Sequence, residues 1–250
     1  MTRYFDDLDE AVVVDVETTG LSPETDRIIS VSLLRVCFAT LDRQTNSHRL
    51  EGDTLDTTVN PQRPIPADAT RVHGVTNADV ADAGPFAEAA QQIRDFIGTR
   101  PIVAHNAAFD KAFLSAEFKR AGVKTLHRNR SYCTMQRYQA MQDGRRKGST
   151  LEEVAHYFGI PGRRSAVHQA SEDVQITCAI AGMFYLIDQE LADRAYDPEE
   201  WYDPEESSAS PAPGVFSFPE EFSPVSSSLT PALVMVTGAR EQQKVPSSDV

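Results

Sequence analysis

Two carboxylates stand two residues apart at the end of an apolar run near the start of the chain. Val12, Val13 and Val14 are β-branched and favour a buried strand, and Asp15 and Glu17 follow them. Successive side chains of a strand point to opposite faces, so Asp15 and Glu17 share a face. Two like charges on an apolar strand are unfavourable unless something neutralises them. Oxygen ligands of this kind favour Mg²⁺ or Mn²⁺, although a strand ending in a solvated Thr-Thr-Gly turn has the same pattern.

Two later segments place further acidic residues at the start of helical patterns. Asp110 comes soon after His105 and a short apolar run, and Asp173 follows His168 by five residues within the longest helical pattern. Considered alone, Asp110 is also a good helix N-cap, and Asp173 is an ordinary surface residue. The joint pattern is therefore more informative than either segment.

These residues resemble the DEDD exonuclease superfamily in its His-containing branch, the DnaQ-like 3'-5' exonucleases, and among them the proofreading exonucleases of bacterial replicative polymerases. The spacing of five between His168 and Asp173 matches the His branch, whereas the sister branch places a Tyr where this chain has Gln169. The resemblance covers roughly residues 9–188. Further matching segments, in the family's order, are Asp26-Arg27-Ile28-Ile29-Ser30, Asn60-Pro61, Ile65-Pro66, Val72-His73-Gly74-Val75-Thr76 and Phe109-Asp110-Lys111-Ala112-Phe113-Leu114.

The resemblance implies a two-metal active site. Asp15 would bridge two Mg²⁺ or Mn²⁺ ions, with Glu17 and Asp173 on the first ion and Asp110 on the second, directly or through water. Two ions roughly 3.5–4 Å apart can stabilise both the attacking and the leaving oxygen of a phosphodiester. His168 would be the general base, because neutral imidazole can accept a proton near pH 7.

The resemblance also implies contacts to the terminal nucleotide. The main chain around Thr18 and Thr19 would meet it, Leu21 would wedge against its base, and Asp68 and His73 match positions that approach it.

For several other residues the sequence is compatible with either a functional or a structural role. Phe109 could stack on a base or pack in the core. His105 is interpreted mainly as a hydrogen-bonding residue that fixes the turn after its strand, rather than as a direct catalyst. Five basic residues could touch phosphates, but each is more simply explained as part of a solvated loop: Arg145, Arg146, Lys147, Arg163 and Arg164.

The negative charge of the chain is concentrated at its C-terminal end. The formal net charge is −13, of which residues 188–250 contribute −10 and residues 1–187 contribute −3. Residues 1–187 include the four proposed metal ligands, so two bound divalent cations would bring the net charge of this region close to zero. This is not the basic profile of a tight duplex binder. It suits an enzyme that holds a short single strand mainly through metals.

The cysteines and the lengths of the apolar runs bear on whether this is a disulfide-rich, zinc-binding or membrane protein. Cys37, Cys133 and Cys178 argue against a disulfide framework or a zinc site and suit a reducing cytoplasm. No run approaches the roughly 18 apolar residues of a membrane span, and the acidic N-terminus lacks a signal-like region.

The order of the predicted elements indicates an α/β fold. Strands are expected at 11–17, 28–38 and 53–59, followed by helices at 85–97, 110–121, 135–141, 151–158 and about 168–192, with further strands at 102–104 and 130–134. The resemblance implies an RNase H-like mixed five-stranded sheet of order 3-2-1-4-5, flanked by helices.

We expect residues 1–195 to form an exonuclease domain and residues 196–250 to form an acidic, Pro/Ser-rich disordered tail. Within the tail, the apolar stretch 229–236 either binds a partner, such as a DNA polymerase or clamp, or has none.

The expected activity is metal-dependent 3'-5' hydrolysis of single-stranded DNA ends to nucleoside monophosphates, in proofreading or repair. The alternatives are an RNA 3'-trimming exonuclease and a non-catalytic polymerase-docking module.

Overall fold

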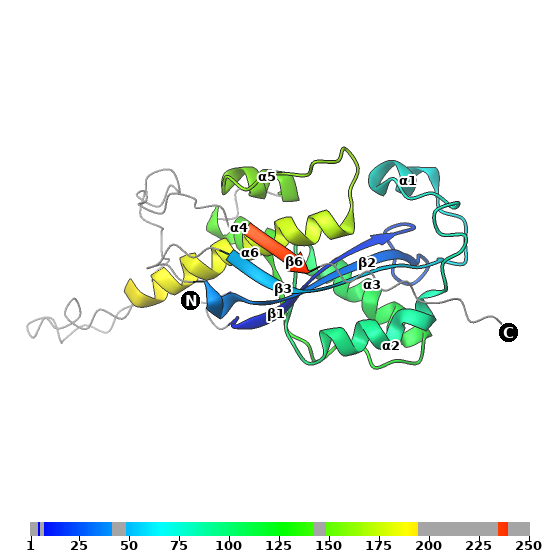
Figure 1. The fold of residues 1–250 in the computed structure, drawn as a ribbon, viewed down its shortest axis with the longest axis horizontal. Helices are drawn as coiled ribbons and strands as arrows, with labels where there is room; N and C mark the ends of the chain where they lie inside the picture. Colours follow the sequence, from blue (N-terminus) through cyan, green and yellow to red (C-terminus); the bar gives the residue numbers. More distant parts are fainter. Residues whose placement is uncertain (1–4, 6–7, 42–48, 143–148, 195–234, 240–250) are drawn as a thin grey trace, which may run out of the picture.

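One mixed β-sheet lies between two groups of helices (Figure 1). The computed structural model describes residues 5, 8–41, 49–142, 149–194 and 235–239. The sheet has the order β5-β4-β1-β2-β3-β6, with β2 antiparallel to both of its neighbours and the other pairs parallel. Its strands are β1 (Glu10–Thr18), β2 (Ile28–Cys37), β3 (Arg49–Thr58), β4 (Ile102–Ala104), β5 (Ser131–Cys133) and β6 (Met235–Ala239).

The helices divide between the two faces of the sheet (Figure 1). The long helix α6, with α4 and α5, covers one face, and α2 and α3 cover the other. The helices are α1 (Ala67–His73), α2 (Phe86–Ile97), α3 (Ala107–Arg120), α4 (Thr134–Met141), α5 (Leu151–Tyr157) and α6 (Ala170–Arg194), and a 3₁₀ turn spans Phe38–Thr40.

Strand β1 is buried on both faces, which explains its run of valines. Val12 and Val14 pack into the core under α2 and α3, whereas Val13 packs into the core under α6. Burying a valine side chain contributes about 1.5–3 kcal/mol relative to exposure. The alternation puts Asp15 and Glu17 on one face, as predicted, and that face is the α6 side.

The predicted five strands and their order 3-2-1-4-5 are confirmed. The third strand begins at Arg49, earlier than expected. Helix α1 was not predicted, because only seven residues separate Pro66 from Gly74, whose φ of 75° ends the helix.

Strand β6 was also not predicted. It comes from the segment expected to be a disordered tail and pairs in parallel with β3 through residues 235–239. Most of the apolar stretch 229–236 lies outside the described residues, as do Arg145, Arg146 and Lys147. The division of the chain at residue 195 stays a prediction.

A buried ion pair joins helices α4 and α6 at a distance from the site described below. Arg137 and Asp188 are 7% and 5% exposed and form an ion pair, and the backbone N–H of Phe5 donates to Asp188 at 3.1 Å. Within the described ranges, no helix is both long and apolar enough to cross a membrane.

Candidate active site

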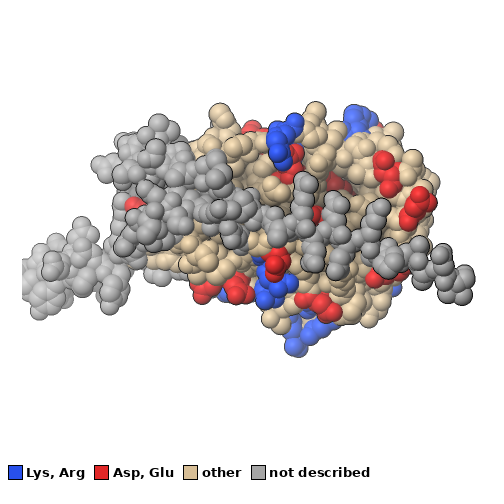
Figure 2. Space-filling view, viewed as in Figure 1, with Lys and Arg blue, Asp and Glu red and all other residues tan. Residues whose placement is uncertain are grey.

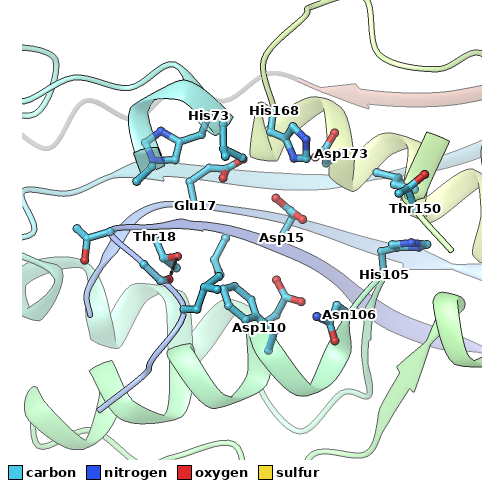
Figure 3. A pocket seen from close by; sticks show the side chains of 18 of the residues that line it. Asp15, Glu17, Thr18, His73, His105, Asn106, Asp110, Thr150, His168 and Asp173 are labelled. Carbon is cyan, nitrogen blue, oxygen red and sulfur yellow. Dashed lines mark hydrogen bonds and ion pairs between the residues drawn. The ribbon is translucent and has the colours of Figure 1, made fainter. Parts of the chain in front are cut away.

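A cavity of about 620 Å³ opens beside the carboxyl end of β1, bordered by α1, α3 and α6. Figure 3 shows Asp15, Glu17, Asp110 and Asp173 pointing into the same space, with His168 next to Asp173. Every residue predicted as a ligand, base or nucleotide contact lines this cavity. The full set is Asp15, Glu17, Thr18, Thr19, Leu21, Asp68, His73, His105, Phe109, Asp110, His168 and Asp173.

The four carboxylates come from three elements that the sheet order brings together. Strand β1 provides Asp15 and Glu17, and the parallel neighbour β4 leads directly into α3, whose first turn contains Asp110. Helix α6 crosses the opposite face and contributes Asp173 from its first turn. Glu17, Asp110 and Asp173 are at most 8% exposed, and Asp15 is partly buried.

Burial raises the pKa values of three of these acids, Asp15, Glu17 and Asp110. Burial raises the pKa of Glu17 to about 8, and the nearby carboxylate of Asp173 acts in the same direction. Burial raises the pKa of Asp110 to about 7, against backbone hydrogen bonds that favour its ionised form. The pKa of Asp15 is raised well above its ordinary value by burial, then by Asp110 and Glu17. The site therefore favours added positive charge.

The geometry fits a divalent cation. Oε1 of Glu17 is buried and has no hydrogen-bond partner among the described residues, although buried carboxylate oxygens are ordinarily paired. Ligand atoms of Glu17, His168 and Asp173 lie within 4.8 Å of one another. Carboxylate oxygens are the donors that Mg²⁺ and Mn²⁺ prefer.

Arg163 supplies a positive charge to this cluster. Its guanidinium binds both carboxylate oxygens of Asp173, one at 2.7 Å, and it also contacts Glu152. The Arg163 side chain is only 8% exposed. The prediction that Arg163 belongs to a solvated loop is therefore wrong, because it is the cation that approaches the buried acids. Arg164 does match that description, with a side chain 90% exposed and paired to Glu172.

His168 stands at the edge of the acidic cluster with an exposed ring. Its Nδ1 lies 3.7 Å from Asp173 and 3.2 Å from the Arg163 guanidinium. Arg163 can only donate, so Nδ1 accepts and the neutral ring has its lone pair there. Burial, followed by the charge of Arg163, lowers the pKa of His168 below its usual value. The imidazole is thus neutral at pH 7 and able to accept a proton.

The ring of His105 is fixed by two hydrogen bonds. Its Nε2 donates to the Ser149 carbonyl at 3.0 Å, and Nδ1 accepts from the Thr134 hydroxyl at 3.0 Å. Both ring nitrogens are occupied, and burial lowers the pKa. In Figure 3 the ring lies away from the carboxylates and toward Thr150. This geometry agrees with the predicted role in fixing the turn after β4.

The two ring nitrogens of His73 have different surroundings. Nδ1 accepts from the Val75 backbone N–H at 3.1 Å, so the proton resides on Nε2. That Nε2 is buried without a hydrogen-bond partner in the described part of the chain. Burial lowers the pKa of His73 and keeps the ring neutral.

The hydroxyls of the two threonines at the end of β1 are already hydrogen-bonded within the turn. Thr18 donates its hydroxyl to the Gly20 carbonyl at 2.6 Å, and Thr19 donates to Asp26 at 3.2 Å. Both threonine side chains are buried, whereas Leu21 is 85% exposed. The hydroxyls are therefore occupied, and the contacts of Thr18, Thr19 and Leu21 with a nucleotide stay predictions.

The remaining lining residues form an apolar wall and a polar rim. Val72 is 49% exposed and, with Leu21, is one of the two large hydrophobic side chains that are exposed in the described residues. The Phe109 ring packs 4.7 Å from Phe113 and also lines the cavity, so it has both a core side and a cavity side. Asp68 is exposed at the rim and paired with Arg71.

The comparison with known families decides the classification. The family model described as Exonuclease, RNase_T, matches residues 12–181. The chain belongs to the RNase_T exonuclease family. The family resemblance predicted from the sequence motifs is confirmed.

Two proteins with similar sequences have names that refer to DNA polymerase III. A DNA polymerase III subunit epsilon-like protein of Rhodobacter capsulatus is 35% identical over 167 residues, covering 66% of this chain and 22% of that protein. The DNA polymerase III subunit epsilon of Pasteurella multocida is 30% identical over 174 residues, covering 66% of this chain and 64% of that protein. The chain thus spans less than two thirds of the length of either relative.

Solved structures with a similar fold exist. E. coli Exonuclease I in complex with a dT13 oligonucleotide superposes with a TM-score of 0.57 at 22% identity, over 74% of this chain and 43% of that one. This likeness supports the RNase H-like fold.

Motif analysis missed Arg163 as a partner of Asp173, and it missed Val72 and Asn106 as lining residues. Arg163 lies in a loop without periodicity, and no local signal indicates its partner ten residues later. Val72 and Asn106 could have been found, because each adjoins a histidine that the motifs singled out, His73 and His105.

The raised carboxylate pKa values predict how stability depends on pH. Glu17 and Asp110 titrate near pH 8 and 7 in the folded chain and near pH 4 in the unfolded chain. Unfolding then releases protons in this window, so the metal-free protein loses stability as pH rises toward 8. Histidines with lowered pKa act oppositely, but only below about pH 6.5. In chelator, Tm should fall from pH 6.5 to 8 in calorimetry.

Added Mg²⁺ or Mn²⁺ should raise Tm more at pH 8 than at pH 6.5, because the ions replace the protons. Glu17→Gln is the matched control and should flatten the pH dependence. A metal-free Tm that stays level or rises over this window would show that the cluster is not strained by its own charge.

Arg163 should compete with a metal ion for Asp173. Arg163→Gln removes the competing cation, so the variant should bind Mn²⁺ roughly tenfold more tightly, the equivalent of about one charged hydrogen bond. Isothermal titration of metal-free protein, without nucleic acid, measures this affinity. Arg164→Gln, which changes the exposed neighbour, should leave it unaltered. Equal or weaker binding by Arg163→Gln would contradict the competition.

Proposed function

We propose that this chain is a metal-dependent 3'-5' exonuclease that removes nucleoside monophosphates from single-stranded DNA ends. The observation that carries the proposal is the convergence of Asp15, Glu17, Asp110 and Asp173 in one cavity, with an unpaired buried oxygen on Glu17. Membership of an exonuclease family supports the reaction class. A non-catalytic docking module would have no use for so costly an assembly of buried acids.

Each site residue has a separate task in this proposal. Asp15, Glu17, Asp110 and Asp173 would hold two Mg²⁺ or Mn²⁺ ions, which would supply charge neutralisation at the phosphodiester and at the departing 3'-oxygen. Arg163 must leave Asp173 first, and its departure frees the Nδ1 lone pair of His168. His168 then takes a proton from the attacking water.

The shape of the cavity mouth supports a short single strand as substrate. Leu21 and Val72 offer exposed apolar surface to the terminal base, and Thr18, Thr19 and His73 line the cavity beside them. On the face shown in Figure 2, acidic and basic side chains of the described residues are interspersed rather than gathered into a basic stripe. We infer that affinity depends on the terminal nucleotides more than on a long backbone track.

The cellular setting is part of the same proposal. The relatives named as DNA polymerase III subunits support a role in proofreading, with repair as the alternative. A polymerase or clamp would be the protein partner, reached through the region after residue 195. Cys37, Cys133 and Cys178 are free thiols, which suits the cytoplasm.

Digestion of labelled oligonucleotides tests the activity. With a 5'-labelled single strand, Mg²⁺ should give a ladder that shortens from the 3' end, and excess chelator should abolish it reversibly. Matched RNA and duplex DNA separate the alternatives: preferential RNA shortening would replace the DNA assignment with 3'-trimming of RNA. Undiminished cleavage in chelator, or shortening from the 5' end, would reject the proposal.

His168 should affect turnover and spare metal binding. His168→Ala removes the base, so kcat should fall by about 10²–10⁴-fold, the usual contribution of a positioned general base. Mn²⁺ affinity, measured by titration on the same sample, should change little. His156→Ala on α5 is the control and should behave like the wild type. A collapse of Mn²⁺ affinity in His168→Ala would make this residue a ligand instead.

A further inference from the structure

A buried glutamate outside the cavity ties the nucleotide-facing turn to helix α3. Glu117 is 1% exposed and lies seven residues after Asp110 on the same helix. Its carboxylate accepts from Arg27 Nε at 2.7 Å and from a second guanidinium nitrogen of Arg27 at 3.1 Å. It also accepts from the Ile28 backbone N–H at 3.3 Å and lies 3.2 Å from Arg120.

The residues bound by Glu117 anchor the turn between β1 and β2, residues 19–27. Arg27 pairs with Thr19 across the base of this turn: the Thr19 N–H donates to the Arg27 carbonyl at 2.9 Å, and the Arg27 N–H donates to the Thr19 hydroxyl at 3.1 Å. Arg120 donates to the Pro23 and Glu24 carbonyls at 2.5 and 2.9 Å. The base of the turn is therefore attached to α3 through the Glu117 carboxylate, and its middle through Arg120, whose guanidinium pairs with the same carboxylate.

The turn itself has little freedom once its base is held. Asp26 accepts from the Thr19 hydroxyl at 3.2 Å and from the Ser22 N–H at 3.0 Å. A Cβ at Gly20 would lie 2.4 Å from the Asp26 carboxylate, so the backbone closes tightly there. Leu21, which projects into solvent with 85% exposure, depends on the turn for its position.

We propose that Glu117 is a positioning residue for the nucleotide-facing turn, acting through Arg27 and Arg120. It holds residues 19–27 in register with Asp110, so that the surface that binds the terminal nucleotide and one metal ligand are set by the same helix. This inference rests on the proposed function for its kinetic consequence, but its structural content concerns the turn alone.

A buried charge is a costly way to gain stability, which is why positioning is the better explanation. Replacing a buried ion pair with apolar residues often leaves stability unchanged or improved, whereas its directional hydrogen bonds specify one arrangement. Glu117 makes contacts that no apolar side chain could reproduce, since it fixes two guanidinium groups and a backbone N–H at once.

Glu117→Gln tests the proposal on the full chain. Glutamine keeps the size but loses the charge that holds both arginines. We expect KM for a single-stranded oligonucleotide to rise about tenfold with kcat within about threefold, the signature of lost binding rather than lost chemistry. Mn²⁺ affinity should match that of the wild type. Amide hydrogen exchange should quicken in 19–27 before it does in α6.

Asp188→Asn is the matched control, because it removes the carboxylate of the buried Arg137–Asp188 pair, and neither residue lines the cavity. It should lower Tm as Glu117→Gln does, without changing KM or exchange in 19–27. Arg27→Gln should raise KM by itself, and combining it with Glu117→Gln should add little.

Exchange in 19–27 that stays at the wild-type rate in Glu117→Gln overturns the proposal, as does an equal rise of KM in Asp188→Asn. A wild type that degrades no nucleic acid would instead refute the exonuclease function, while the exchange data would still decide whether Glu117 holds the turn.

Discussion

Repulsion among four closely spaced carboxylates is the constraint on which the rest of this structure depends. Three of them are nearly fully buried, and the pKa of Glu17 rises to about 8 as a result. The carboxylates stay close together only if the backbone that carries them is held against their repulsion. Strand β1 provides this support for Asp15 and Glu17. The strand pairs with β2 along its length and with β4 at Val12 and Val13, and its valines pack on both faces, so the stretch that leads to Asp15 and Glu17 is firmly held.

Two features reduce the negative charge of the cluster: the raised pKa values of Asp15, Glu17 and Asp110, and the guanidinium of Arg163. Arg163 binds both oxygens of Asp173, but Oε1 of Glu17 stays without a partner in the described residues. Partial compensation of this kind makes a site receptive to divalent cations, because each ion can satisfy several oxygens at once. The segments around the cluster are held by complete hydrogen bonding. His105 uses both ring nitrogens, and Glu117 connects the turn after β1 to α3.

Features of the fold and site could be predicted where a short stretch of sequence or a family motif indicates them. The pairing of Asp15 with Glu17 on one face follows from strand periodicity, and the five-strand order followed from the family resemblance. Asp110 and Asp173 have no local signal that sets them apart from a helix cap or a surface residue, so only the joint motif pattern selected them. Their convergence in one cavity agrees with that selection. Arg163 and β6 were missed because each depends on a partner distant in sequence or unmarked by pattern.

Metal stoichiometry is the most direct test of the account, because the cluster should bind two ions that share Asp15. Metal-free protein titrated with Mn²⁺ and followed by electron paramagnetic resonance should bind two ions per chain. Their spectrum should be that of a spin-coupled pair, as expected for ions roughly 3.5–4 Å apart. Asp15→Asn should lose the coupled signal. A single uncoupled ion in the wild type, or a coupled pair that persists in Asp15→Asn, would contradict the account.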